Sequence, residues 1–154
     1  SIPSSFLTKK SASRLSVMDF DTARLIVDFG LVIVIWMVQL IVYPSFLFYK
    51  DTQLITWHTK YTPRITKIVA PLMFAQLSLS VFGLFQGITA YSILYAALVL
   101  SMWILTISVF IPIHEKIQEG SASTDLLQRL VRTNWYRTAI WTFIFLVTLA
   151  KVLY

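Results

Sequence analysis

Along this chain, apolar blocks that are long enough to cross a membrane are separated by polar segments. Residues 68–113 include no Asp, Glu, Lys, Arg or His. At about 1.5 Å per helical residue this block is too long for one crossing of a ~30 Å hydrocarbon layer, and it fits two. The polar, glycine-containing residues 86–92 interrupt it. The pattern predicts two antiparallel transmembrane helices joined by a tight turn.

One further apolar span lies on each side of this pair. We therefore predict an all-α integral membrane protein with four transmembrane helices in an antiparallel bundle, at about residues 23–48, 65–85, 91–113 and 135–154. Asp19 or Asp21 is expected to cap the first helix, and Pro63 to begin the second, with Pro71 as a kink inside it. Asp28 is interpreted as a first-turn partner of the helix dipole, paired with Arg24.

Polar segments separate the spans. Residues 50–67 form a basic link, and in residues 114–133 Gly120 fits a helix end and Ser123 or Thr124 a helix start. Residues 125–133 place leucines on one face and Gln and Arg opposite, which predicts a short interfacial helix before the fourth span. Residues 23–154 are thus expected as the membrane domain. Residues 1–22 are expected as a basic tail on the membrane surface, or in part as a leader ahead of Met18.

Composition supports a membrane protein and narrows its partners. The chain is 57% hydrophobic and 13% charged, and it has no Cys, which excludes disulfides, thiolate metal sites and cysteine redox catalysis. The net charge of +6 lies beside the apolar spans, which favours anionic membrane lipids over nucleic acid as partners. Basic residues are more frequent on the side with the long links, which favours a cytoplasmic location for those links. We expect a bacterial inner membrane, with an organellar membrane as the alternative.

Each span carries polar or aromatic positions at helical spacing. At about 100° per residue these form stripes that are expected to face one another inside the bundle. Their depths predict a one-sided pocket, open toward the long links. The candidate pocket residues are Gln39, Tyr43, His58, Tyr61, Gln76, Trp103, Thr106, His114, Asn134, Arg137 and Trp141.

Several chemistries remain open for these residues. Gln and Thr inside spans often only join helices by hydrogen bonds, and Trp and Tyr often form interfacial belts. His58 and His114 would be able to ligate a metal with Glu115, Glu119, Tyr61 or Gln76, or a haem axially. Alternatively, His114, Asn134 and Arg137 would hold an anionic or carbonyl-bearing ligand. The sequence contains no P-loop, dinucleotide-binding glycine motif, Ser–His–Asp pattern or haem-attachment motif.

Several short motifs resemble a family of small four-helix bacterial membrane proteins, some of them grouped as anthrone-oxygenase-like. The motifs are Gln39-Leu-Ile-Val-Tyr43-Pro44-Ser-Phe46, Trp57-His58 followed by Thr62, Ile65, Pro71 and Met73, Trp103-x-x-Thr106, Pro112-Ile-His114-Glu-Lys, Gly120, and Asn134-Trp135-Tyr-Arg137-Thr138-x-x-Trp141. The resemblance implies the four-helix membrane fold. In the family pattern a second His often stands at the place of Tyr61 and a Glu at that of Gln76, which with His58 and His114 would form a metal cluster. Here both positions hold poorer ligands.

Two functions are expected from these observations. The first is a small membrane subunit or binding module, whose pocket holds a lipid, quinone-like or pigment-like ligand, or which packs against a larger complex or a second copy. The second is an oxidoreductase or oxygenase for an aromatic or quinone-like substrate. There His58 and His114 would act as ligands or acid/base groups, and Asn134 and Arg137 as oxyanion donors. A transporter is disfavoured, because the polar positions indicate no path across the membrane.

Overall fold

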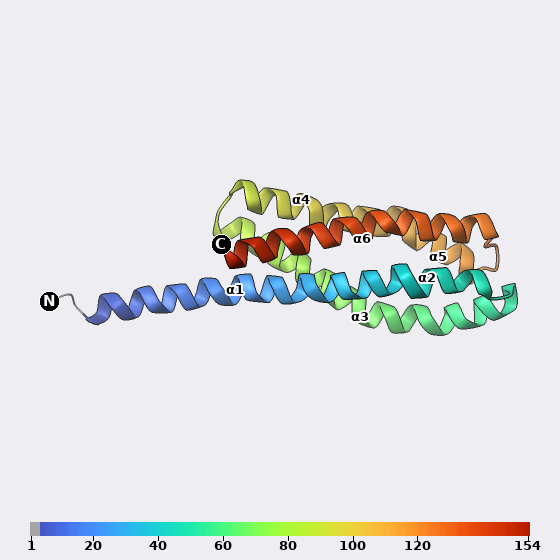
Figure 1. Ribbon diagram of the computed structural model, residues 1–154, viewed down its shortest axis with the longest axis horizontal. Coiled ribbons are helices and arrows are strands. Elements are labelled where there is room, and N and C mark those ends of the chain that lie inside the picture. Colours follow the sequence, from blue (N-terminus) through green and yellow to red (C-terminus); the bar gives the residue numbers. More distant parts are fainter. Residues whose placement is uncertain (1–3) are drawn as a thin grey trace.

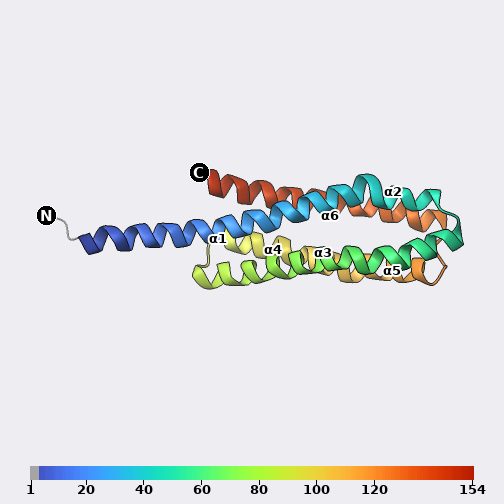
Figure 2. The same cartoon turned by 90° about the horizontal axis from the view of Figure 1, so that it is seen from below.

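Helices account for nearly all of the structure. The computed structural model describes residues 4–154, with side chains from Phe20 onward. Within that range, four helical rods lie side by side, and successive rods run in opposite directions (Figures 1 and 2). The rods are α1–η1–α2–η2 (Ser4–Met37, Val38–Val42, Tyr43–Ser45 and Phe46–Phe48), α3 (Asp51–Gln86), α4–η3–α5 (Ala90–Leu105, Thr106–Phe110 and Ile111–Gln118) and α6 (Thr124–Leu153).

Each rod is long and apolar enough to cross a membrane. Among the described residues the four candidate spans are Phe20–Phe48, Asp51–Gln86, Ala90–Gln118 and Thr124–Leu153. Large apolar side chains cover the outside of the bundle; Ile26 and Ile41, for example, are each 65% exposed. An apolar exterior is what a hydrocarbon environment requires. The prediction of an all-α protein with four apolar membrane helices is confirmed.

The first helix begins much earlier than the sequence pattern indicated. α1 begins at Ser4 and extends beyond the other rods (Figure 1), so Asp19 and Asp21 lie inside it and do not cap it. Asp28 accordingly lies far from the first turn. The predicted basic tail, residues 1–22, falls partly outside the described residues, because residues 1–3 and the side chains before Phe20 are not described.

The predicted basic link at residues 50–67 belongs mostly to α3. Pro63 therefore lies inside this helix, and the prediction that it begins the second helix is wrong. Leu54, His58 and Tyr61 are buried at helical spacing, so the segment packs its inner face against the bundle. Pro63 is exposed, and at such a position water or head groups can satisfy the carbonyl that loses its helical partner.

The predicted interfacial helix at residues 125–133 is not a separate element. It forms the first turns of α6, which continues without a break to Leu153. Leu127 and Leu130 are 7% and 0% exposed and belong to a buried apolar cluster with Phe46 and Ile117. Packing against the bundle end therefore directs these turns along the bundle axis.

Two π-helical turns widen the rods beside prolines. In η1 the amide of Tyr43 donates to the carbonyl of Val38, and in η3 the amide of Ile111 donates to that of Thr106. Pro44 and Pro112 immediately follow these donors. A proline ring clashes with the carbonyl four residues earlier, and a wider turn relieves that clash. Each π turn inserts one extra residue, which shifts the register of every side chain beyond it.

Short, well-capped turns join the last three rods. Thr89 and Ser92 form a reciprocal capping box at the start of α4, and the Ser123 hydroxyl caps α6. After α5, Gly120 has φ +74°; its amide donates to Ile117 O at 3.1 Å, and the next amide donates to Lys116 O at 3.0 Å. This Schellman arrangement confirms Gly120 as a helix end.

Candidate functional site

A cavity of about 470 Å³ lies between α1, α3 and the η3–α5 part of the third rod, with α6 behind it. We call it the side cavity. Most of its wall is apolar, and three apolar lining residues, Phe74, Ile107 and Ile111, are themselves 57%, 57% and 46% exposed. Because these residues lie on α3 and on η3–α5, the cavity opens sideways between the two rods. Its size is typical of small-molecule sites.

Four side chains form a hydrogen-bonded series at one end of the side cavity, which we call the histidine chain. The Tyr43 hydroxyl lies 2.9 Å from His114 Nε2, and His114 Nδ1 lies 2.8 Å from His58 Nε2. His58 Nδ1 is 3.0 Å from Gln118 Oε1. All four side chains line the cavity. The series therefore connects the cavity wall to the exposed Gln118 at the end of the bundle.

The outer bonds of the series fix its direction. The Thr59 hydroxyl donates to Ile55 O at 2.8 Å, so it accepts from Gln118 Nε2, 2.6 Å away. The oxygen of Gln118 then faces His58, so for neutral rings His58 carries its proton on Nδ1 and accepts at Nε2. His114 donates from Nδ1 by the same reasoning and accepts the Tyr43 proton at Nε2. Every donor in the histidine chain therefore points along it from Tyr43 toward Gln118.

Three buried polar atoms beside the cavity lack hydrogen-bond partners among the described residues. They are Nε of Arg137, Nε1 of Trp103 and Oγ1 of Thr106. All three residues line the cavity. The Arg137 guanidinium lies over the Phe110 ring, with its Cζ 4.3 Å from the ring centroid, and 5.0 Å from the centroid of Trp141. Buried polar atoms without partners are rare in native proteins, so these three atoms need partners that the described residues do not provide.

The structure brings eight of the eleven candidate pocket residues to the side cavity. These are Tyr43, His58, Tyr61, Trp103, Thr106, His114, Arg137 and Trp141. Gln39, Gln76 and Asn134 do not line it. Gln39 donates to Val131 O at 3.2 Å and accepts from Asn134 Nδ2 at 3.0 Å, which joins the first rod to α6. Gln76 Oε1 accepts from the cavity residue Trp141 at 3.2 Å.

Asp28 occupies the centre of a second polar group, the Asp28 cluster (Asp28, Gln76, Tyr95 and Thr148). Its carboxylate is 0% exposed and accepts from Gln76 at 2.6 Å, Tyr95 at 2.8 Å and Thr148 at 2.7 Å. One residue therefore joins all four rods. The expected pairing with Arg24 is wrong: Arg24 lies near Asp21, at 3.9 Å, and donates to Leu79 O at 3.3 Å.

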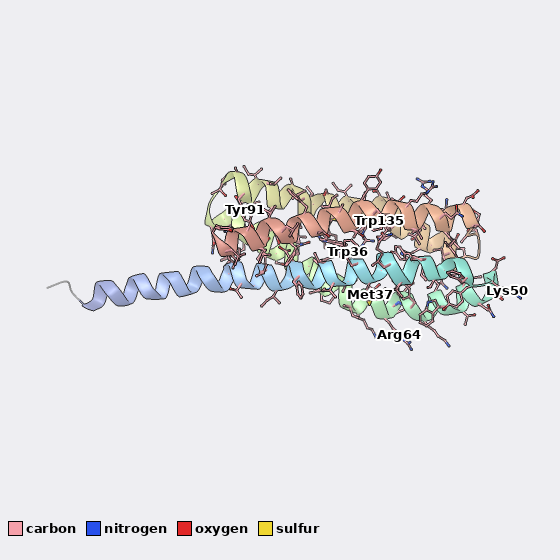
Figure 3. All side chains as sticks on the ribbon, in the orientation of Figure 1. Trp36, Met37, Lys50, Arg64, Tyr91 and Trp135 are labelled. Atoms are coloured by element: carbon pink, nitrogen blue, oxygen red, sulfur yellow. The ribbon has the colours of Figure 1, made fainter. Side chains whose placement is uncertain are left out.

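The polar interior is therefore not confined to one side of the bundle. Tyr91, which contacts Thr148 at 3.4 Å, lies at the opposite end from Lys50 (Figure 3). The one-sided pocket was inferred because the short turn at residues 86–92 contributes little polar material. That inference assigned Asp28 to the helix dipole and gave Tyr95 and Thr148 no place in a site. A charged residue inside an apolar span was the signal that could have identified this cluster.

Sequence patterns also missed much of the cavity wall. From the sequence alone, four of these wall residues look like ordinary apolar span positions: Val69, Ala70 and Phe74 on α3, and Phe110 at the end of η3. The sequence pattern assigns Gln118 to a polar link, and it suggests Glu115 only as a possible metal ligand. Only the packing of α3 against η3–α5 places these residues around one space.

The two histidines lie next to each other, with ring centroids 5.1 Å apart. Across the described residues, no group of three or more His, Cys, Asp or Glu side chains is arranged to hold a metal ion. The facing nitrogens of the two rings are hydrogen-bonded to each other, and Gln76 is engaged by Asp28 and Trp141. The geometry therefore offers donors and acceptors for a small molecule more readily than a ligand set for a metal.

Comparison of the chain with known protein families, with curated proteins and with solved structures finds no match. The case for a function therefore rests on the side cavity and the side chains around it.

Proposed function

We propose that this protein binds a membrane-soluble ligand, lipid-like, quinone-like or pigment-like, in the side cavity. The observation that carries this proposal is the apolar cavity of about 470 Å³ with three buried polar groups that lack partners among the described residues. Leaving such groups unsatisfied costs about 1–3 kcal/mol each, and more for a charged group. A ligand with oxygen acceptors removes this cost.

The sideways opening supports the same proposal. Its exposed lining residues face the hydrocarbon layer, so an apolar molecule reaches the cavity without crossing water. The walls then bury the apolar part, while the Arg137, Trp103 and Thr106 donors orient the polar part. Such a division between apolar walls and a few directed polar groups is typical of small-molecule sites.

The test is native mass spectrometry of the protein extracted from its own membrane in mild detergent. We expect one small apolar molecule per chain, retained through purification. Ala70→Phe fills the cavity and should abolish this adduct. The matched control is Ala97→Phe, which places the same ring on the exposed face of α4. An empty cavity, with larger proteins bound in fixed ratio, would instead favour an assembly subunit.

A second candidate, acid–base catalysis on the bound ligand, is favoured by the histidine chain. A ligand hydroxyl at Tyr43 would pass its proton to the Tyr43 oxygen as the Tyr43 proton moves to His114 Nε2. The proton on His114 Nδ1 would then move to His58 Nε2. Arg137 would stabilise the ligand oxyanion that forms. This fits the expected oxidoreductase or oxygenase acting on an aromatic substrate.

The direction of the histidine chain is open to direct measurement. Because the chain holds two histidines, the imidazole ¹⁵N spectrum is simple to assign. We expect both rings as Nδ1–H tautomers, and Gln118→Leu to disturb the His58 signals more than those of His114. Two Nε2–H tautomers would contradict the relay.

A further inference from the structure

We infer that the ligand of the side cavity is an anion, a membrane-soluble carboxylate whose head group lies against Arg137. The inference rests on the proposed function and adds to it the charge of the ligand. It starts from the chemistry of one residue. A guanidinium stays protonated in proteins, and the Arg137 side chain is 6% exposed within a membrane helix.

The protein itself offers Arg137 no counter-charge. The titratable groups that interact with it are Tyr43, Tyr61 and His114, none of which is a carboxylate. Among the described residues, the carboxylate found in ion pairs is that of Asp21, with Arg24 and Lys151 as its partners. Glu115 lines the cavity but is exposed at the rim and forms no ion pair with Arg137 within the described part of the chain.

Arg24 shows how the same fold accommodates a buried guanidinium by itself. This side chain is 2% exposed, yet it has Asp21 at 3.9 Å and the Leu79 carbonyl at 3.3 Å. Three aromatic rings also lie around it, those of Phe20, Tyr91 and Tyr95. Gly83 provides the space, because a Cβ there would collide with the guanidinium. Arg24 is thus compensated by residues of the chain.

Arg137 has only part of that compensation. Two rings, Phe110 and Trp141, and the Tyr43 phenol interact with its guanidinium, but among the described residues it has no carboxylate in an ion pair as Arg24 has. Its Nε lacks a hydrogen-bond partner there, as does that of Arg24. Cation–π contacts are weaker than charge-assisted hydrogen bonds, and they leave the charge unneutralised. Arg137 also faces an open cavity, whereas Arg24 is enclosed. The guanidinium charge that lacks a counter-charge therefore lies beside the cavity, where the proposed ligand would bind.

Shape selects a carboxylate with an apolar tail. The planar guanidinium fork matches the two oxygens of a carboxylate, and the Tyr43 phenol lies on the same side of the site. From Arg137 the apolar walls lead to the opening between α3 and η3–α5. A long acyl or aromatic tail would follow those walls and emerge among the lipid chains.

The probes are stearate and methyl stearate, added to delipidated full-length protein in a non-ionic detergent and measured by native mass spectrometry at pH 8. The two molecules differ in head-group charge and share the tail. We expect stearate to bind about ten- to a hundredfold more tightly, the usual range for a hydrogen bond to a charged group. Arg137→Gln should remove this preference, because it should weaken stearate binding far more than methyl stearate binding.

Two further variants separate a binding role from a structural one. Arg137→Lys keeps the charge and should retain part of the preference. Arg24→Gln, the matched control, should leave the preference intact. Without ligand, Arg137→Gln should melt at the same temperature as the wild type or higher, whereas Arg24→Gln should melt lower.

Each outcome decides one of the two claims. Equal binding of stearate and its ester to the wild-type protein overturns the anion inference and leaves the proposed function standing. If neither stearate nor methyl stearate binds to the wild-type protein, the wild type behaves like Ala70→Phe. That result counts against the proposed function itself. Arg137→Gln melting as far below the wild type as Arg24→Gln would also overturn the inference, because Arg137 would then be structural.

Discussion

At the scale of single residues, the interior of this protein depends on a few polar side chains with fixed directions. The Asp28 carboxylate accepts three hydrogen bonds, one from each of the other rods. Gln39 joins the first rod to α6, and the histidine chain joins the first and second rods to α5. In hydrocarbon, where apolar packing discriminates little between helix faces, such bonds determine which faces meet.

Removal of the Asp28 carboxylate should therefore be costly. Asp28→Ala leaves Gln76, Tyr95 and Thr148 without their acceptor in a fully buried place. We expect a loss of about 3–5 kcal/mol in the free energy of unfolding, in the range for breaking a buried charged network. Unfolding by sodium dodecyl sulfate in mixed micelles measures it. Asp51→Ala, at an exposed carboxylate, is the control and should change stability by less than about 0.5 kcal/mol.

At the scale of elements, prolines and glycines decide where the rods bend and end. Pro44 and Pro112 each follow a π turn, and those turns hold the buried side chains of Gln39 and Phe110. Pro63 and Pro71, by contrast, lie on the exposed face of α3 and leave it continuous. The effect of a proline on these helices therefore depends on its surroundings as well as on its ring.

Gly120 tests this reasoning at a helix end. Its φ of +74° is unfavourable for a side chain, and a Cβ would lie 2.9 Å from Ile55 Cδ1. Gly120→Ala should destabilise the protein by about 1–2 kcal/mol, measured by the same unfolding assay. Gly87→Ala is the matched control, because a Cβ there has nothing within 4 Å and its φ of 168° is ordinary extended backbone. Equal losses in both variants would contradict this account.

At the scale of the whole molecule, the rods enclose a cavity that no single helix contains. The Asp28 cluster holds them together toward one end, and the side cavity with the histidine chain lies toward the other. Between them, Trp141 contacts both groups, because it lines the cavity and donates to Gln76. Trp141 thus connects the cavity wall to the Asp28 cluster.

Labelling of single cysteines tests the placement of the rods in a membrane. The chain contains no Cys, so Gln53→Cys, Ser121→Cys and Ile88→Cys each introduce a single thiol. In intact cells, a membrane-impermeant maleimide labels only thiols outside the membrane. It should therefore label either position 88 alone, or positions 53 and 121 without position 88. Positive charges beside the long links predict that position 88 labels from outside. Labelling of all three positions from one side would contradict a bundle that crosses the membrane.

The sequence by itself determined the helical class, the number of apolar spans and eight of the residues that line the cavity. These follow from local physics, since long runs without charge must leave water and polar groups at helical spacing share one face. The capping roles of Ser123 and Gly120 were predictable for the same reason. Residues such as His58, His114 and Arg137 stood out because polar groups are scarce in spans.

Tertiary structure alone decided the rest. Packing at the bundle end made the segments before Ile65 and Trp135 parts of continuous helices, although their local polarity suggested links. The π turns shifted side chains by one residue, which a fixed angle per residue does not anticipate. Asp28 acquired its three partners, and Arg137 its place at the cavity, from helices distant in sequence. Such contacts depend on which faces of the rods meet, and that choice depends on all four rods at once.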